Sequence, residues 1–259
     1  IRSCNTTSMD LVPPIHMTST FKFRDQAHGA GVFTGAEEGY LYSRISNPTV
    51  LQLLEKMALL EGTEDAIATA SGMAAASSVL MSFAHPGDNV VACNALYGGT
   101  FALLHQHLAA FNIETRFLSP KDINDEDQIA SLVDEKTRLF YIESPANPTL
   151  DIIDISLWAS IARTSRIPLA VDNTFASTYL QKPVSLGADI VLHSTTKYLG
   201  GHGDVIGGII TASSEITSLI REAYFNHFGP GMSPFNAWLI LRGLKTLAIR
   251  MNRHSKSAM

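Results

Sequence analysis

The sequence has few cysteines, no long apolar run and no cluster of like charges. Its two thiols, Cys4 and Cys93, lack Cys-x-x-Cys spacing, so neither a disulfide framework nor a structural zinc site is indicated. The most apolar stretch, residues 66–84, is interrupted by hydroxyl residues and a glycine, which favours a buried helix over a membrane span. The net charge of −5 gives no basic field for nucleic acid or anionic lipid. We therefore expect a cytoplasmic protein that acts on a small molecule and binds neither nucleic acid nor a membrane.

Lys197 stands just beyond an apolar segment, residues 188–193, that is typical of a buried strand. Small hydroxyl residues and glycines surround it in the run 194–202. An amine held there is expected to lose part of its hydration, which lowers the lysine pKa and leaves a fraction neutral and nucleophilic. Such an amine can form a Schiff base. A lysine that extends into water from a loop is the alternative interpretation.

Asp172 ends a second apolar run, residues 167–171. Pyridoxal phosphate (PLP) requires an amine for its aldehyde and a carboxylate for its pyridine nitrogen, because the protonated ring withdraws electrons more strongly. Lys197 and Asp172 together offer this pair of groups. The alternative for Asp172 is a helix cap after a strand.

A phosphate site is indicated where residues 69–76 pass from an apolar strand through Ser71 and Gly72 into an alanine-rich helix. The free N–H groups and the dipole at such a helix start attract a dianion. Ser194 and Thr196 are two residues apart, so in an extended segment their hydroxyls lie on one side and add donors to the same phosphate.

Five motifs share the order seen in one enzyme family: Ser71-Gly72-Met73, Tyr97-Gly98-Gly99-Thr100, Glu143-Ser144-Pro145-Ala146-Asn147-Pro148, Asp172-Asn173-Thr174 and Ser194-Thr195-Thr196-Lys197-Tyr198. From about Pro13 to its last residue, the chain resembles the PLP enzymes of cysteine and methionine metabolism. This family includes cystathionine γ-synthase, cystathionine γ-lyase, methionine γ-lyase and the O-acylhomoserine sulfhydrylases. Each motif alone is weakly specific, and the shared order carries the resemblance.

The resemblance implies a role for each candidate site residue. Lys197 is the Schiff-base lysine and proton shuttle, and Asp172 pairs with the pyridine nitrogen. Tyr97 stacks on the cofactor ring and assists the leaving group, unless it is an ordinary core aromatic residue. Asn147 hydrogen-bonds the phenolic oxygen of the cofactor, unless it is only a turn residue, and Glu143 orients its surroundings. The cofactor and its phosphate are also held by Ser71, Gly72, Met73, Ser194 and Thr196.

Strand and helix patterns alternate along the chain, which predicts an α/β fold with a mostly parallel sheet covered by helices. The resemblance implies that this is the fold-type I PLP-transferase architecture. Seven strands are expected, at 65–69, 89–93, 114–117, 138–143, 169–172, 189–193 and 205–211, the last as a candidate antiparallel strand. Helices are expected at 48–61, 72–83, 100–111, 125–133, 155–164 and, as one long helix, 233–256. The five motifs all follow strand ends, where ligands bind in such sheets.

Residues 1–45 are expected to form an extended N-terminal arm, because Gly, Thr and Pro are frequent and periodicity is weak. By resemblance, the arm contacts a neighbouring subunit of a homotetramer, a dimer of dimers, and Tyr42 and Arg44 reach the neighbour's cofactor phosphate. A surface arginine in a turn is the alternative for Arg44. Residues 46–243 form the PLP-binding domain, and 244–259 begin a connection to a C-terminal domain that the chain lacks. Because the chain starts at Ile1, a further N-terminal portion is also expected.

The resemblance implies PLP-dependent γ-elimination on a sulfur amino acid, as in methionine γ-lyase or cystathionine γ-lyase. Residues 40–49 and 100–105 are most similar to methionine γ-lyases. In contrast, Gly99 stands where those lyases have a cysteine, and Phe225-Asn226 stand where they have Lys-Asp. Residues 233–238 are similar to sulfhydrylases. One alternative is therefore γ-replacement on an O-acylhomoserine, by an O-acetyl- or O-succinylhomoserine sulfhydrylase or a cystathionine γ-synthase.

The sequence is also compatible with two functions that involve no sulfur amino acid. In the family, the arginine that binds the substrate carboxylate lies in the part that this chain lacks. One alternative is therefore a PLP-binding remnant without catalysis. An unrelated doubly wound nucleotide binder is the second, although residues 200–203 lack the strand–turn–helix context of a dinucleotide loop. His105 and His107 are spaced to lie on different faces of a helix, so no metal site is expected.

Overall fold

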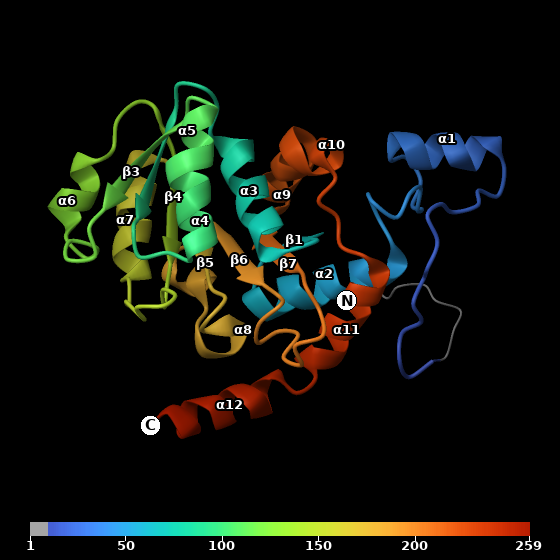
Figure 1. Cartoon of the computed structure of the whole chain (residues 1–259). Coiled ribbons are helices and arrows are strands. Elements are labelled where there is room, and N and C mark those ends of the chain that lie inside the picture. Colours follow the sequence, from blue (N-terminus) through green and yellow to red (C-terminus); the bar gives the residue numbers. More distant parts are fainter. Residues whose placement is uncertain (1–9) are drawn as a thin grey trace.

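The computed structural model describes residues 10–259, which form one seven-stranded mixed sheet with helices on both faces (Figure 1). The strand order is β1-β7-β6-β5-β4-β2-β3. Every neighbouring pair is parallel except those made by β7, which is antiparallel to both β1 and β6. The predicted α/β class, strand number and antiparallel last strand are confirmed. The strands are β1 (Asp65–Thr69), β2 (Asn89–Cys93), β3 (Glu114–Leu118), β4 (Thr137–Glu143), β5 (Leu169–Asp172), β6 (Ile190–Ser194) and β7 (Gly208–Ala212).

The central strands are apolar on both sides because helices cover both faces. On one face, α3 (Gly72–Phe83) packs Val79 against β6 and β7. On the other face, α7 (Ile155–Ser165) places the buried Trp158 edge-on to Phe140, with ring centroids 5.7 Å apart. Each large side chain buried in this way contributes about 1.5–3 kcal/mol. The two clusters hold the parallel strands in register, so that their carboxyl ends meet at one edge of the sheet.

Side-chain caps fix the start of the helices that the sequence predicts best. Asn47, Ser71 and Asp154 each accept a backbone N–H from the first turn of α2, α3 and α7, which stabilises those helix starts. In residues 10–259 no helix has the length and apolar character of a membrane span. The remaining α-helices are α1 (Gln26–Thr34), α2 (Pro48–Glu61), α4 (Gly98–Ala102), α5 (Leu108–Ala110), α6 (Glu126–Ser131), α8 (Ser177–Leu180), α9 (Ser214–Ile220), α10 (Asn226–Phe228), α11 (Pro234–Leu244) and α12 (Leu247–Ala258). Two π-helical segments, Leu103–His107 and Arg221–Phe225, and a 3-10 helix, Pro183–Leu186, lie between them.

The single long helix predicted for 233–256 is wrong, because the chain bends between α11 and α12. At Gly243 an added Cβ would lie 2.2 Å from the Gly200 carbonyl oxygen, so the end of α11 is pressed against the loop after β6. The Gly243 carbonyl accepts from the Thr246 backbone N–H and from Arg250 Nη2 instead of continuing the helix ladder. Figure 1 shows α12 running away from α11 along the margin of the molecule.

The predicted extended arm is only partly extended. Helix α1 interrupts it, with Asp25 accepting from the His28 backbone N–H at its start and Gly35 in the left-handed conformation at its end. Figure 1 shows α1 well apart from the sheet. Residues 1–9 of the arm, including Cys4, lie outside the described part of the chain.

Candidate active site

Two carboxylates lie side by side at the carboxyl edge of the sheet. Glu143 ends β4 and Asp172 ends β5, and the two residues are paired in the parallel register, so their side chains project to the same face. Asp172 Oδ1 accepts hydrogen bonds from the Thr174 backbone N–H at 3.0 Å and from the Thr174 hydroxyl at 2.6 Å. Burial raises the pKa of Asp172, and the bonds from Thr174 oppose that rise. Asp172 is thus oriented by its own turn.

Thr174 also connects Asp172 to the segment that leads to Lys197. Its hydroxyl oxygen accepts the Ser194 backbone N–H at 2.8 Å while its proton goes to Asp172. The ends of β5 and β6 are joined in this way through one hydroxyl. The sequence places Thr174 in a motif without indicating its role, because its two partners come from different strands.

The start of α3 meets Ser194, as the predicted phosphate site requires. The Ser71 hydroxyl accepts the Ala74 backbone N–H at 3.1 Å and caps the helix. A Cβ at Gly72 would lie 2.7 Å from Ser194 Cβ, closer than Cβ atoms approach one another, so only glycine allows this contact. Within residues 10–259 the Ser194 hydroxyl has no hydrogen-bond partner. Unpaired N–H groups of the first turn and a free hydroxyl are therefore gathered at one point.

Thr196 is oriented differently from Ser194. Its hydroxyl accepts the Gly207 backbone N–H at 3.2 Å and donates to the Gly207 carbonyl at 3.3 Å. The structure therefore places Thr196 near the predicted phosphate site but engages its hydroxyl with the loop before β7.

Lys197 is exposed, which corrects the expectation that burial dehydrates it. Strand β6 ends at Ser194, three residues earlier, so the lysine stands in a turn beyond the sheet rather than inside it. It opens onto a cavity of about 320 Å³ lined by Phe175, Tyr198, Gly201, Arg250 and His254.

Arg250 of α12 holds the turn that carries Lys197. Its guanidinium donates to the Tyr198 carbonyl at 2.6 Å and to the Gly243 carbonyl at 2.9 Å, while Nε donates to the Thr246 hydroxyl at 3.0 Å. The sequence offers no signal for Arg250, because an arginine on an amphipathic helix is ordinarily a solvated residue.

Tyr97 and Asn147 approach the carboxylate edge from two loops. The Tyr97 backbone N–H donates to Glu143 Oε2 at 2.7 Å, and the Asn147 backbone N–H donates to Oε1 at 3.0 Å. Tyr97 is 47% exposed, so the alternative of a core aromatic residue is wrong. Its ring lies beside Met73, since a Cβ at Gly99 would be 2.6 Å from Tyr97 Cε1 and 3.1 Å from Met73 Sδ.

Tyr42 and Arg44 lie elsewhere in this chain. Tyr42 and Arg44 are both exposed; the Arg44 guanidinium is 5.5 Å from the centre of the Tyr42 ring and donates to the Asn226 carbonyl. Among the contacts of residues 10–259, none joins either residue to Lys197 or Asp172. A role toward a neighbouring subunit stays a prediction.

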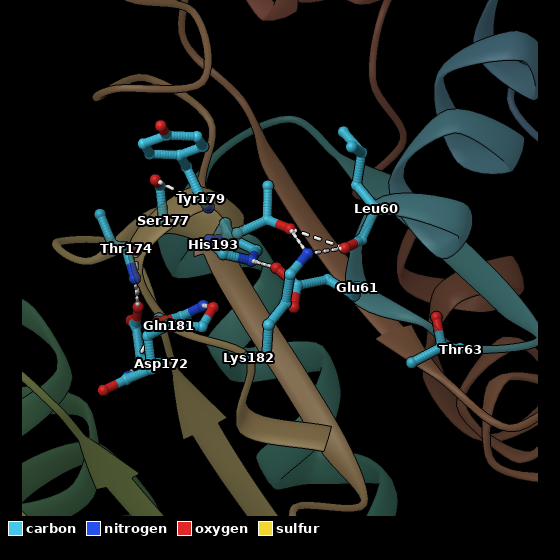
Figure 2. Close-up of polar contacts among 12 residues, drawn as sticks. Leu60, Glu61, Thr63, Asp172, Thr174, Ser177, Tyr179, Gln181, Lys182 and His193 are labelled. Carbon is cyan, nitrogen blue, oxygen red and sulfur yellow. Dashed lines mark hydrogen bonds and ion pairs between the residues drawn. The ribbon is translucent and has the colours of Figure 1, made fainter. Parts of the chain in front are cut away.

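Further polar contacts tie the same sheet edge to α2 (Figure 2). His193 of β6 and Glu61 form a fully buried pair with 2.7 Å between Nε2 and Oε1. Lys182 Nζ donates to the Leu60 carbonyl at the end of α2 and to the Thr178 hydroxyl. In the described part of the chain, no three His, Cys, Asp or Glu side chains form a metal-binding group.

Curated relatives are similar to this chain over most of its length. An L-methionine gamma-lyase of Pseudomonas putida is 45% identical over 249 residues, which are 96% of this chain and 62% of that protein. An O-succinylhomoserine sulfhydrylase of Pseudomonas aeruginosa is 41% identical over 93% of this chain and 59% of its own length. The chain thus spans about three fifths of the length of these curated relatives.

A solved structure gives the same result for the fold. A putative O-acetylhomoserine (thiol)-lyase of Campylobacter jejuni, which holds N'-pyridoxyl-lysine-5'-monophosphate, superimposes with a TM-score of 0.89 at 32% identity. The match covers 95% of this chain and 69% of that one, and the fold is that of the fold-type I PLP enzymes, as predicted. The family model described as Cys/Met metabolism PLP-dependent enzyme matches residues 2–259. The chain therefore belongs to the family of PLP-dependent enzymes of cysteine and methionine metabolism.

Proposed function

We propose that this chain forms the cofactor-binding part of an enzyme that eliminates the γ-substituent of a sulfur amino acid, with Lys197 as the residue that binds the cofactor aldehyde. The observation that carries the proposal is the contact between Gly72, at the start of α3, and Ser194. It brings a helix N-terminus to the strand end from which the Lys197 turn begins, beside the Asp172 carboxylate.

The residues present fit PLP. The free Ser194 hydroxyl and the first turn of α3 suit a phosphate. Thr174 holds Asp172 as an acceptor for the pyridine nitrogen. The exposed amine of Lys197 is accessible to an aldehyde. When bound, PLP supplies a ring that withdraws electrons from the α-carbon of an amino acid.

Each proposed role follows from where the residue lies. Once free of the aldehyde, the Lys197 amine would take the α-proton, pass that proton to Tyr97 or to water and, neutral again, take a β-proton, because its long and flexible side chain can reach two neighbouring carbons. Tyr97 presents an exposed ring at the same edge, next to Met73, where it would stack on the cofactor ring and donate a proton to the leaving group. Asn147, in the turn after β4, would hydrogen-bond the phenolic oxygen of bound PLP.

The choice of γ-elimination rests on similarity and is the finer part of the proposal. The methionine gamma-lyase of Pseudomonas putida is 45% identical to this chain, compared with 41% for the sulfhydrylase of Pseudomonas aeruginosa. The second candidate is γ-replacement on an O-acylhomoserine, which these sulfhydrylase relatives favour. A PLP-binding piece without catalysis is the third, because the chain spans only part of its relatives. The proposed location of the whole enzyme is the cytoplasm.

The first experiment tests cofactor binding by this chain. We expect PLP to give visible absorbance that borohydride removes, with the label found on a peptide containing Lys197, whereas Lys197→Ala gives no covalent label. Lys182→Ala is the control, since the amine of Lys182 is engaged with α2 and not with the candidate site. Labelling that persists in Lys197→Ala would contradict the assignment.

The second experiment identifies the reaction with the longest available form of the protein. Methionine, cystathionine and O-acetylhomoserine are supplied with and without sulfide, and the products are measured. A keto acid and ammonia formed without a thiol support elimination. Strict dependence on sulfide would establish replacement instead. Cofactor binding without turnover of any of them would establish the third candidate.

A further inference from the structure

Glu143 holds two candidate cofactor residues by their backbones. Its two carboxyl oxygens accept the Tyr97 N–H at 2.7 Å and the Asn147 N–H at 3.0 Å. Tyr97 precedes α4 and Asn147 lies in the turn after β4, so the two residues share no secondary-structure element. One carboxylate therefore sets the separation between an aromatic ring and a side-chain amide at the same site.

Both bonds are strongest when Glu143 is ionised. A carboxylate has lone pairs on both oxygens and no proton, so each oxygen can accept. A neutral carboxyl group carries its proton on one oxygen, which then opposes an N–H donor or turns away from it. Glu143 is only 3% exposed, so water does not replace the lost bond. Gain of a proton consequently releases one of the two backbones.

The surroundings bring this proton gain close to neutral pH. Burial, followed by the charge of Asp172, raises the pKa of Glu143 to about 7, while the two backbone N–H bonds oppose the rise. Tyr141 of the same strand and Cys93 of β2 also lie within electrostatic reach of Glu143. Burial raises the pKa of Tyr141 well above its usual value and that of Cys93 to about 11, so both stay neutral. In residues 10–259 no ion pair involves Glu143.

We propose that Glu143 is a positioning residue that holds Tyr97 and Asn147 in their cofactor-binding arrangement when ionised and releases one of them when protonated. The inference rests on the cofactor site proposed above. Ionised Glu143 should favour binding, and a cation beside Asp172 should in turn favour ionised Glu143, because the charge of Asp172 is one cause of the raised pKa. Cofactor affinity is thus expected to rise as the pH passes through about 7.

The first test needs no cofactor. In amide NMR spectra recorded from about pH 5.5 to 8.5, the Tyr97 and Asn147 N–H signals should shift with one shared midpoint near 7. In Glu143→Gln both shifts should disappear, because an amide side chain does not titrate and always presents one NH₂ group to a donor. Glu135→Gln, at an exposed glutamate before β4, is the matched control and should keep the titration. A wild type without a shared midpoint between about pH 6 and 8, or a Glu143→Gln variant that retains it, would overturn the proposal.

The second test measures PLP affinity at two pH values. Glu143→Gln should bind PLP about 10-fold more weakly than wild type near pH 8.5 and within about 2-fold near pH 6, where wild type itself is protonated. A residue with only a structural role would weaken binding equally at both pH values, and that outcome would contradict the inference. If wild type fails to bind PLP, the proposed function fails, whereas the amide titration still decides the role of Glu143.

Discussion

Gly72 has no room for a side chain where the start of α3 meets the end of β6. Because a Cβ there would lie 2.7 Å from Ser194 Cβ, Gly72→Ala must displace either α3 or the end of β6. We expect the free energy of unfolding to fall by about 1–3 kcal/mol and PLP affinity to fall with it. Denaturant unfolding and cofactor titration measure the two effects. Gly98→Ala, at the start of α4, is the control, since nothing lies within 4 Å of its added Cβ. Equal losses in both variants would refute this account of Gly72.

Thr174 offers a sharper test of how Asp172 is held. Thr174→Val keeps the volume but removes the hydroxyl that donates to Asp172 and accepts from Ser194. We expect about a 10-fold loss of PLP affinity, because a hydrogen bond to a charged group contributes about 1.5–3 kcal/mol. The control is Thr164→Val, on the exposed side of α7, whose hydroxyl bonds only its own helix. Unchanged affinity in Thr174→Val would show that the backbone N–H alone orients Asp172.

For single residues, the sequence indicates which side chains take part in the candidate site more reliably than how buried they are or what they contact. The amine of Lys197 and the carboxylate of Asp172 are recognisable because their chemistry is in their own side chains. Lys197 is exposed rather than buried, because β6 ends at Ser194 and the lysine follows in a turn. The residue at which a strand ends depends on tertiary structure, so the sequence pattern did not show it. Arg250 and Thr174 could not be assigned because each acts on atoms from elements that are distant in sequence.

Among the elements, α12 depends most on one side chain. Arg250 joins α12 to the carbonyl of Tyr198 and to the end of α11. Its Nε, Nη1 and Nη2 atoms each donate a hydrogen bond, whereas a lysine has a single ammonium nitrogen. Arg250→Lys should therefore lower the free energy of unfolding by about 1–3 kcal/mol. It should also speed the borohydride labelling of Lys197 by loosening its turn. Arg253→Lys, exposed on the same helix, should change neither quantity. If the two variants behave alike, α12 does not hold the turn.

Helix boundaries marked by capping residues could be predicted, and interruptions could not. The pattern of α11 continues into α12 without a proline, and the break comes from Gly243 pressing on Gly200, a contact that no local signal reports. In the same way, the predicted helix at 100–111 passes through a wider π-helical turn, Leu103–His107, between α4 and α5. Helix α8 has too few residues for its periodicity to be recognised, and α9 continues into α10 through a second π-helical segment, Arg221–Phe225, in a stretch for which no helix was predicted.

At the scale of the whole molecule, the role predicted for Tyr42 and Arg44 in the site of a neighbouring subunit can be tested. We therefore expect Arg44→Ala and Lys197→Ala to complement one another when mixed. In randomly formed dimers with two-fold symmetry, half are hybrids with one intact site of two, so about 25% of wild-type labelling should return. The measurement is borohydride-fixed PLP on Lys197 relative to each variant alone. Labelling no greater than the sum of the separate variants would place Arg44 in the site of its own chain or in none.

The strands and the edge where the motifs meet could be predicted for the whole chain, because apolar runs followed by polar motifs are a local pattern. The order of the strands could not, since β7 lies between β1 and β6 although it comes last in the chain. The strand order depends on which helix packs on which part of the sheet. The helix faces that meet the sheet are nearly all apolar, so the sequence does not distinguish one helix position from another.

The place of β7 also affects how the protein is made. Strand β1 lies at the edge of the sheet, where β7 is the one strand of residues 10–259 that pairs with it, beside a single bridge from Thr69 to Gly231. Asp65 therefore has no strand partner before Ala212 is made. During synthesis the ribosome delivers β1, and the candidate phosphate site at the helix start after it, long before their partner strand has emerged. The nascent chain must therefore pass through a stage in which five parallel strands can assemble while β1 is unprotected. Chaperone contact during translation is expected to concentrate on that early segment.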